Sequence, residues 1–242
     1  MPERNSEQKF GKRYHRKTYT NTYQRRWEES PVQSRESAKE IILNHIKSLE
    51  HDRVDIGKLN YLGIGAGTGL TEFNSYMNGL EKFKTVTILD IAKRHSSFIY
   101  PVKNVFNLEA DAENLPIKTG SIDLATCLMS QDLYPDRDKS TQEIRRVLIP
   151  EGKAIVFLHH QKNFEGALKA VEPGEASVHP ESVELYKHLL ANNKLFKNER
   201  AIRKHYEGNG LAVEKINEHK PENPADYWNY WWEVVLRKKA KK

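Results

Sequence analysis

The chain has 242 residues, 38% of them hydrophobic and 30% charged, which fits one α/β domain with additions and is short for two full domains. Apolar runs stay well below the ~18 residues of a membrane span, and the charged first residues lack a signal peptide's apolar segment, so we expect a cytoplasmic protein without a membrane span. The single cysteine, Cys127, excludes an internal disulfide, and its apolar neighbours predict a buried thiol.

The net charge of +6 is concentrated at the two ends of the chain. Residues 1–26 carry eight basic against two acidic side chains, and residues 237–242 carry five basic ones, so the part between them is mildly acidic. Basic ends are typical of segments that bind nucleic acid or a membrane surface, and equally of terminal charge that is only solvated. We expect the tail, 237–242, to be unnecessary for ligand binding, because it follows the last predicted strand.

The N-terminal part reads as an arm followed by one helix. Tyr14, Tyr19, Tyr23 and Trp27 alternate with arginines, which suggests a segment that docks on another surface. We expect it to cover a binding site as a lid, with Tyr19 and Tyr23 as candidates for substrate contact. Apolar residues at helical spacing then predict a core-packing helix that ends near Leu49.

Strand and helix signals alternate in the rest of the chain, which predicts a seven-stranded, mostly parallel sheet with helices on both faces. The expected strands are 60–64, 85–89, 105–108, 122–128, 153–158, 211–216 and 230–236. Helices are expected at 70–77, 92–98, 138–148 and 195–206, and another is opened by Pro180. Along the last strand, alternation places Trp231 and Trp232 on opposite faces of the sheet.

These elements divide one α/β domain into four parts. We expect an N-terminal arm and helix (1–58), a ligand-binding core (59–160), a helical insertion that serves as a second part of the lid (161–207), and the last two strands with the basic tail (208–242). No internal repeat is present.

The glycine-rich turn after the first expected strand is the strongest local signal. Gly65, Gly67 and Gly69 lie between a buried strand and a helix, an arrangement that leaves backbone N–H groups bare and lets a ligand approach the main chain, as in nucleotide sites. The dinucleotide pattern G-x-G-x-x-G is not met, because Leu70 stands where its third glycine would be, and the lysine of a triphosphate loop is absent.

Asp90 strengthens the prediction of a nucleotide-type site. It ends the second expected strand, 21 residues after Gly69. In dinucleotide sites an acid about 20 residues beyond the loop binds the ribose hydroxyls, and the same geometry serves any ligand that carries a ribose. Charge-assisted hydrogen bonds to two neighbouring hydroxyls would fix the position of the ligand.

Two further segments complete a family pattern. Residues 110–116 read A-D-A-E-N-L-P and are followed by G-S-I-D-L at 120–124, and residues 143–152 read E-I-R-R-V-L-I-P-E-G. Together with the G-x-G-x-G loop they resemble the class I S-adenosylmethionine-dependent methyltransferases typified by the ubiquinone and menaquinone biosynthesis enzymes. The resemblance covers roughly residues 59–160, and it implies a Rossmann-like fold and S-adenosylmethionine as the cofactor.

The resemblance also implies roles for individual residues. In that family the aspartate of the A-D-A segment receives the adenine amino group and the next backbone N–H contacts the ring, which implies these roles for Asp111 and Ala112. Asp123 is expected to be structural. The implied cofactor-binding residues are Gly63, Gly65, Ala66, Gly67, Gly69, Asp90, Ile91, Asp111, Ala112, Met129 and Ser130.

The chain departs from the family pattern at two positions. Many members carry an acid where this chain has Gly63, so the amino group of the cofactor needs another partner; loop carbonyls, Ser130, Gln131 and the N-terminal arm are all open. Glu151 replaces a family glycine, and we expect the turn to tolerate it.

The acceptor side of the site is expected beyond the carboxyl ends of the strands, where parallel sheets bind their ligands. Asp132 lies there without an evident role, and Gln131 and Tyr134 are candidates for substrate contact. His159 and His160 follow the fifth strand and are candidates for a general base, because an imidazole titrates near neutral pH; a structural role for each is equally open. No spacing indicates a metal site.

Three functions remain open from the sequence. The motifs favour methyl transfer to oxygen, nitrogen or carbon of a small-molecule metabolite. The basic ends and interleaved aromatic residues leave a methyltransferase acting on RNA or protein as the alternative. A non-catalytic scaffold is the third reading, although the intact loop, Asp90 and Asp111 speak against it. The oligomeric state is not indicated by the sequence.

Overall fold

The structure is a computed structural model that describes residues 32–66, 79–91, 103–171, 180–191, 194–222 and 230–240. Several predicted features lie outside these residues. They are the aromatic arm with Tyr19 and Tyr23, the loop residues Gly67 and Gly69, and the helices expected at 70–77 and 92–98.

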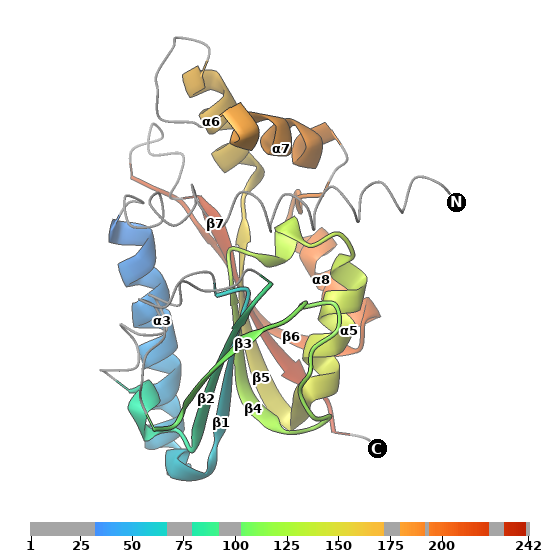
Figure 1. The fold of residues 1–242 in the computed structure, drawn as a ribbon. Helices are drawn as coiled ribbons and strands as arrows, with labels where there is room; N and C mark the ends of the chain where they lie inside the picture. The colour runs from blue at the N-terminus through green and yellow to red at the C-terminus, as the bar shows by residue number, and fades with distance from the viewer. Residues whose placement is uncertain are drawn as a thin grey trace.

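The core is a seven-stranded sheet, as predicted from the sequence (Figure 1). The strand order is β3-β2-β1-β4-β5-β7-β6. The first five strands in this order are parallel, and β7 runs antiparallel to both β5 and β6. The strands are β1 (Asn60–Ile64), β2 (Thr85–Asp90), β3 (Val105–Glu109), β4 (Ile122–Leu128), β5 (Leu148–His159), β6 (Leu211–His219) and β7 (Trp231–Lys238).

Helices cover both faces of the sheet, which confirms the α/β prediction. Figure 1 shows α3 on one face, α5 and α8 on the other, and α6 and α7 beyond the end of β5. The helices are α3 (Val32–His51), α5 (Arg137–Val147), α6 (Gln161–Val171), α7 (Pro180–Ala191) and α8 (Glu199–Gly208). Short 3₁₀ turns, η2 (Ile56–Lys58), η3 (Leu80–Lys82) and η5 (Gln131–Leu133), connect them to the strands.

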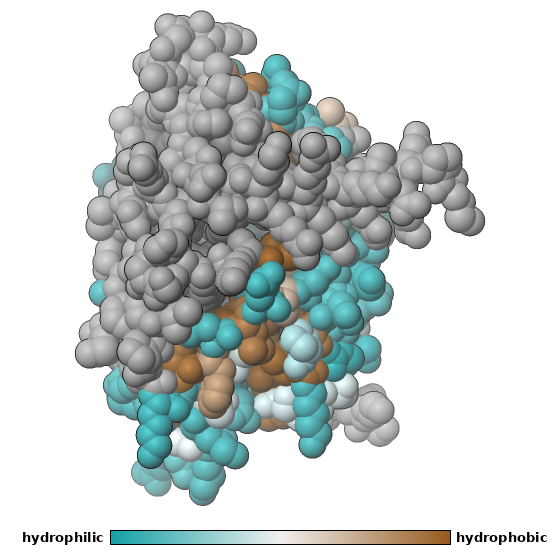
Figure 2. Space-filling model, in the orientation of Figure 1, coloured by the Kyte–Doolittle hydropathy of each residue, from teal (hydrophilic) through white to brown (hydrophobic). Residues whose placement is uncertain are grey.

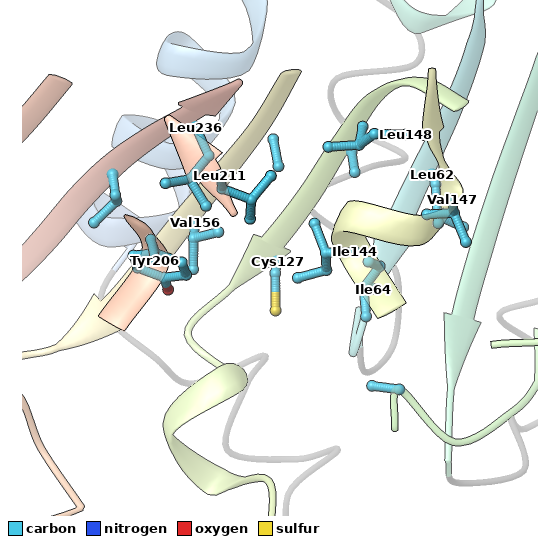
Figure 3. Close-up of a cluster of buried hydrophobic side chains, with 14 of the residues drawn as sticks. Leu62, Ile64, Cys127, Ile144, Val147, Leu148, Val156, Tyr206, Leu211 and Leu236 are labelled. Carbon is cyan, nitrogen blue, oxygen red and sulfur yellow. The ribbon is translucent and has the colours of Figure 1, made fainter. Parts of the chain in front are cut away.

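Alternation along the strands produces two separate apolar layers. Trp231 and Phe157 pack in the cluster that contains Ile42 of α3, whereas Trp232 belongs to the cluster on the opposite face, which confirms that the neighbouring tryptophans point apart. Figure 3 shows the second cluster, in which Cys127 lies among leucine, isoleucine and valine side chains. The thiol is buried, as predicted, and burial raises its pKa to about 11.

The segment expected to be a helical insertion, 161–207, contains two kinds of helix. α6 and α7 form a pair around Phe164 and Leu185 that also contacts Leu133 of η5. α8 instead packs on the sheet, because its Ile202 and Tyr206 are fully buried in the second apolar layer. Of the helices described in this segment, α6 and α7 therefore stand outside the layered core.

The outer surface of the described part is mostly polar. Figure 2 shows hydrophobic side chains gathered in the lower half of one face, over the strands, with hydrophilic residues around them. On the edge strand β3, Phe106 is 51% exposed. Within the ranges that the structure describes, no helix is long and apolar enough to cross a membrane.

The first two residues of the basic tail belong to the last strand, which was expected to end at residue 236. β7 continues to Lys238, and the Arg237 guanidinium pairs with Glu151 and, at 2.6 Å, with Glu214. Glu151 also accepts the Ala240 N–H at 2.9 Å, and this hydrogen bond, followed by Arg237, lowers the pKa of the carboxyl group. Glu151 takes a left-handed backbone with φ of 66°, the conformation that favours glycine, and its side-chain bonds offset that cost.

The E-x-x-R segment of α5 holds the loop that follows β3. Glu143 accepts the Leu115 N–H at 2.7 Å, and Arg146 donates to the carbonyls of Leu115 and Ile117 at 2.9 and 2.8 Å. The two side chains also pair with each other at 2.7 Å, and the bond to Arg146 lowers the pKa of Glu143. One ion pair thus satisfies backbone groups that would otherwise lack partners.

We predict that Arg146→Ala lowers the free energy of unfolding by about 1–3 kcal/mol, because it removes the donor to two carbonyls and leaves Glu143 with the Leu115 N–H alone. The control is Arg145→Ala at the neighbouring, exposed position, which should change stability by less than about 0.5 kcal/mol. Denaturant titration of both variants measures the difference. Equal stability of the two would show that the ion pair does not hold the loop.

Candidate functional site

The strand order reverses at β1, which lies between β2 and β4. In open α/β sheets ligands bind beyond the carboxyl ends of the strands at such a reversal. Ile64 pairs with Leu89 on one side and with Cys127 on the other, so Gly65 and Asp90 lie level with each other just beyond β1 and at the end of β2. Gly65 and Asp90, two of the residues predicted to bind the cofactor, therefore come together at the expected edge.

Gly65 occupies a position where no side chain fits. Its φ is 61°, and a Cβ atom there would lie 2.2 Å from the Tyr134 hydroxyl and 2.5 Å from the Ser130 hydroxyl. The loop after β4 thus packs directly against the backbone at the end of β1. The glycine is needed for this close approach as well as for its left-handed conformation.

Asp90 is buried at the end of β2, with 5% of its surface exposed. The turns on both sides of it are fixed by the main chain: the Ala66 N–H donates to the Leu89 carbonyl at 3.1 Å, and the Ala110 N–H donates to the Asp90 carbonyl at 2.9 Å. These bonds hold the Asp90 backbone between the glycine loop and the A-D-A segment. Ile91 follows it and is partly buried.

The A-D-A segment forms a tight turn after β3. Asp111 accepts the Glu113 N–H at 2.9 Å, a local bond that fixes the turn, and Ala112 is 6% exposed. Glu113 in turn accepts the Asp136 N–H at 2.9 Å, which ties this turn to the loop before α5. Glu113 was not among the predicted residues, because its partner is remote in the sequence.

The end of β4 is strained. Met129 has a φ of 54°, an uncommon conformation for a residue with a side chain, and its N–H donates to the Phe157 carbonyl at 2.9 Å. The turn lets the Ser130 hydroxyl lie 2.9 Å from the Tyr134 hydroxyl and 3.2 Å from Cys127. Strained residues of this kind cluster at ligand sites.

The side chains of Tyr134 and Gln131 hold the loop after β4 in place. The Tyr134 hydroxyl lies next to Gly65 and hydrogen-bonds with the Ser130 hydroxyl, and burial raises its pKa well above the usual value. Gln131 is fully buried, donates to Thr141 at 2.9 Å and accepts from the Tyr206 hydroxyl. The expectation that the Gln131 side chain contacts the substrate is therefore corrected: it points into the core, where its amide is already bonded.

The two histidines after β5 have different surroundings. His160 is 8% exposed, its Nδ1 accepts the Lys162 N–H at 3.1 Å and its Nε2 lies 3.3 Å from Glu218. Burial lowers its pKa, which favours a neutral ring with both nitrogens occupied. This arrangement corrects the expectation for His160, because a base needs a free nitrogen.

His159 remains as the candidate base. Its backbone N–H donates to Asp132 at 2.7 Å, and its ring Nδ1 lies 3.3 Å from the same carboxylate oxygen. Asp132 is 1% exposed and pairs with Arg137 at 3.3 Å. The sequence places Asp132 at this edge but does not reveal its role, because His159 and Asp132 are 27 residues apart.

The comparison with protein families agrees with this geometry. Residues 62–156 match the family model described as methyltransferase domain, and this range holds the glycine loop, Asp90 and the A-D-A turn. Residues 62–156 form a class I S-adenosylmethionine-dependent methyltransferase domain. The predicted family resemblance is thereby confirmed, and S-adenosylmethionine is the cofactor that such a domain takes.

A curated relative matches part of the chain. The chain is 33% identical over 79 residues to a 2-phytyl-1,4-naphtoquinone methyltransferase from Nostoc sp., and the match covers 33% of this chain and 34% of that protein. The chain thus matches about a third of the length of the curated relatives.

Solved structures share the fold at low identity. An S-adenosylmethionine-dependent methyltransferase from Mesorhizobium loti superposes with a TM-score of 0.55 at 16% identity, covering 79% of this chain and 96% of the other. The [4+2]-cyclase SpnF gives a TM-score of 0.54 at 13% identity, covering 76% of each chain.

The described residues fit the cofactor of a methyltransferase domain. Asp90 ends β2 and Asp111 lies in the turn after β3, so carboxylates stand where a ribose and an adenine amino group are expected. The resemblance assigns Asp90 to the ribose and Asp111 to the adenine. The roles of Gly67 and Gly69 stay predictions, because these residues lie outside the described ranges.

We predict that Gly65→Ala removes binding of S-adenosylmethionine, measured by calorimetry, and lowers the free energy of unfolding by about 2–4 kcal/mol through backbone strain and overpacking. Gly120→Ala is the control, because Gly120 has a similar φ of 63° but nothing within 4 Å of the added Cβ. The control should show the stability cost of the left-handed backbone without a collision between the added Cβ and its neighbours. Unchanged binding by Gly65→Ala would contradict the close packing of this loop.

Proposed function

We propose that this protein transfers the methyl group of S-adenosylmethionine to a small-molecule acceptor. The observation that carries the proposal is the meeting of Gly65, Asp90 and Asp111 at the reversal of strand order, within a methyltransferase domain. The bound cofactor supplies an activated methyl group whose leaving group is a neutral thioether. The chain itself must then bind, orient and exclude water.

The motifs favour methyl transfer over other chemistry on the same fold. SpnF, described as a [4+2]-cyclase, has a similar architecture, so the fold alone does not decide the reaction. The intact cofactor edge distinguishes this chain from a bare scaffold. The curated relatives support an acceptor with a flat ring system, although their match covers only a third of the chain.

The helices after β5 support a covered acceptor pocket. α6 and α7 pack on Leu133 of η5. This 3₁₀ turn comes directly after Met129 and Ser130, two of the predicted cofactor-binding residues. We propose that this helix pair, together with the N-terminal arm that contains Tyr19 and Tyr23, closes over the acceptor. A lid of this kind would exclude water during the transfer.

The proposal is tested by ligand choice and by transfer. Calorimetry should show binding of S-adenosylmethionine and of its demethylated product, and no comparable binding of NAD. Incubation with S-adenosylmethionine labelled in its methyl group should then move label to 1,4-naphthohydroquinone kept under nitrogen, or to another acceptor in a set of phenols and amines. Label transfer to RNA or protein alone would contradict the small-molecule proposal.

We predict that Asp90→Ala weakens binding of S-adenosylmethionine by about 1–3 kcal/mol, the value of hydrogen bonds to a charged group. Asp90→Asn should lose less, because it keeps one acceptor oxygen. The matched control is Glu109→Ala, since Glu109 is the exposed partner of Asp90 on β3. Normal binding by Asp90→Ala would place the ribose elsewhere.

A further inference from the structure

A buried carboxylate at the end of β4 connects two sides of the proposed acceptor site. Asp132 has a fully buried side chain and lies in η5, directly after the strained turn of β4. One carboxylate oxygen faces Arg137, and the other faces both the backbone and the ring of His159. The carboxylate therefore joins η5 and α5 to the last residue of β5.

Arg137 supplies the positive charge that a buried carboxylate requires. Its guanidinium also donates to the Lys194 carbonyl and lies 4.2 Å above the Phe196 ring. Both partners belong to the segment before α8. They hold Arg137 in place, and Arg137 in turn holds Asp132 in one orientation. The carboxylate is thus positioned before any ligand arrives.

The chemistry of the pair determines which ring nitrogen of His159 carries a proton. An ionised carboxylate only accepts hydrogen bonds, so Nδ1 must be the donor, and the neutral ring then has a lone pair on Nε2. Within the described ranges, Nε2 has no hydrogen-bond partner. The ring lies 5.1 Å from the Phe164 ring of α6, centroid to centroid and tilted by 37°, and 13% of the His159 side chain is exposed.

We propose that His159 is a general base for the transfer and that Asp132 is the residue that positions it. This inference rests on the proposed function and narrows it: the acceptor group carries a proton that must leave on methylation, as in a phenol, an enol, a hydroquinone or an amine. The acceptor forms its new bond to the methyl carbon, and the carbon–sulfur electron pair stays on sulfur. The acceptor's proton moves to Nε2 of His159, and the imidazolium releases it to water.

A purely structural reading of the same contacts predicts different behaviour. If Asp132 only fastens η5 to β5, its bond to the His159 backbone N–H at 2.7 Å would suffice, and the ring would be replaceable. His159→Asn separates the two readings. The asparagine amide can take the place of Nδ1 and bond to Asp132, but it offers nothing in the place of Nε2.

The first test needs no acceptor. Long-range ¹H–¹⁵N spectra of ¹⁵N-histidine-labelled protein report which ring nitrogen carries the proton, and the spectrum of His159→Asn identifies the His159 signals among the ten histidines. We expect the Nδ1–H form in the wild-type protein and its loss in Asp132→Asn. An Nε2–H form in the wild type, or identical signals in Asp132→Asn, would overturn the proposal.

The second test measures transfer to 1,4-naphthohydroquinone. We expect His159→Asn to bind S-adenosylmethionine as the wild type does and to be about 10²–10⁴-fold slower in transfer. His160→Asn is the matched control: its amide oxygen can still accept the Lys162 N–H, so the first turn of α6 is kept and transfer should be retained. Equal rates for His159→Asn and the wild type would exclude the base. If the wild type itself transfers nothing, the proposed acceptor class fails, and the spectra decide on the pair alone.

Discussion

The close contact between Gly65 and the loop after β4 is the constraint on which the candidate site depends. The end of β1 must carry no side chain, since the hydroxyls of Ser130 and Tyr134 already fill the space where one would begin. Met129 accepts a left-handed backbone so that Ser130 can reach this position. Once that contact is made, Gln131 and Asp132 are placed by the same turn on opposite sides, one toward the core and one toward β5.

The family motifs act as one connected unit. The E-x-x-R segment of α5 holds residues 115–119, and Glu113 bonds to the backbone ahead of α5, so the chain that leaves the A-D-A turn is tied to α5. The other end of the turn is held by the Ala110 N–H, which donates to the Asp90 carbonyl. The carboxylate of Asp111 is therefore positioned by a helix that begins 26 residues later in the chain. This explains why the E-x-x-R segment belongs to the pattern that identifies the domain: it determines where the A-D-A turn lies.

The sheet was predictable from the sequence, because β-branched and apolar runs separated by turns specify strands without knowledge of their partners. All seven strands lie where they were expected, although β5, β6 and β7 extend further. What could not be predicted depends on partners remote in the sequence. The tail residue Arg237 bonds to Glu151, and a charge count cannot distinguish such a residue from one that is only solvated.

The site shows the same limit at shorter range. Gln131 and Asp132 are adjacent polar residues after the same strand, and so are His159 and His160 after another. Sequence position places all four at the correct edge of the sheet but gives no direction for any side chain. Direction comes from packing: Tyr206 and Thr141 draw the Gln131 amide inward, and Glu218 and the start of α6 occupy both nitrogens of His160.

The end of β5 connects the proposed base, His159, to the helix pair α6–α7. His160 accepts the N–H of Lys162 and thereby fixes the first turn of α6. Its neighbour His159 lies against Asp132, and its ring contacts Phe164 of the same helix in a tilted arrangement. Any movement of α6 toward or away from the strand ends would therefore shift the His159 ring through its contact with Phe164. The same helix also carries the α6–α7 pair that packs on η5, where Asp132 is located. If α6 and α7 close over an acceptor as proposed, closure and orientation of the proposed base depend on one set of contacts, and an incorrect closure would also misplace the base.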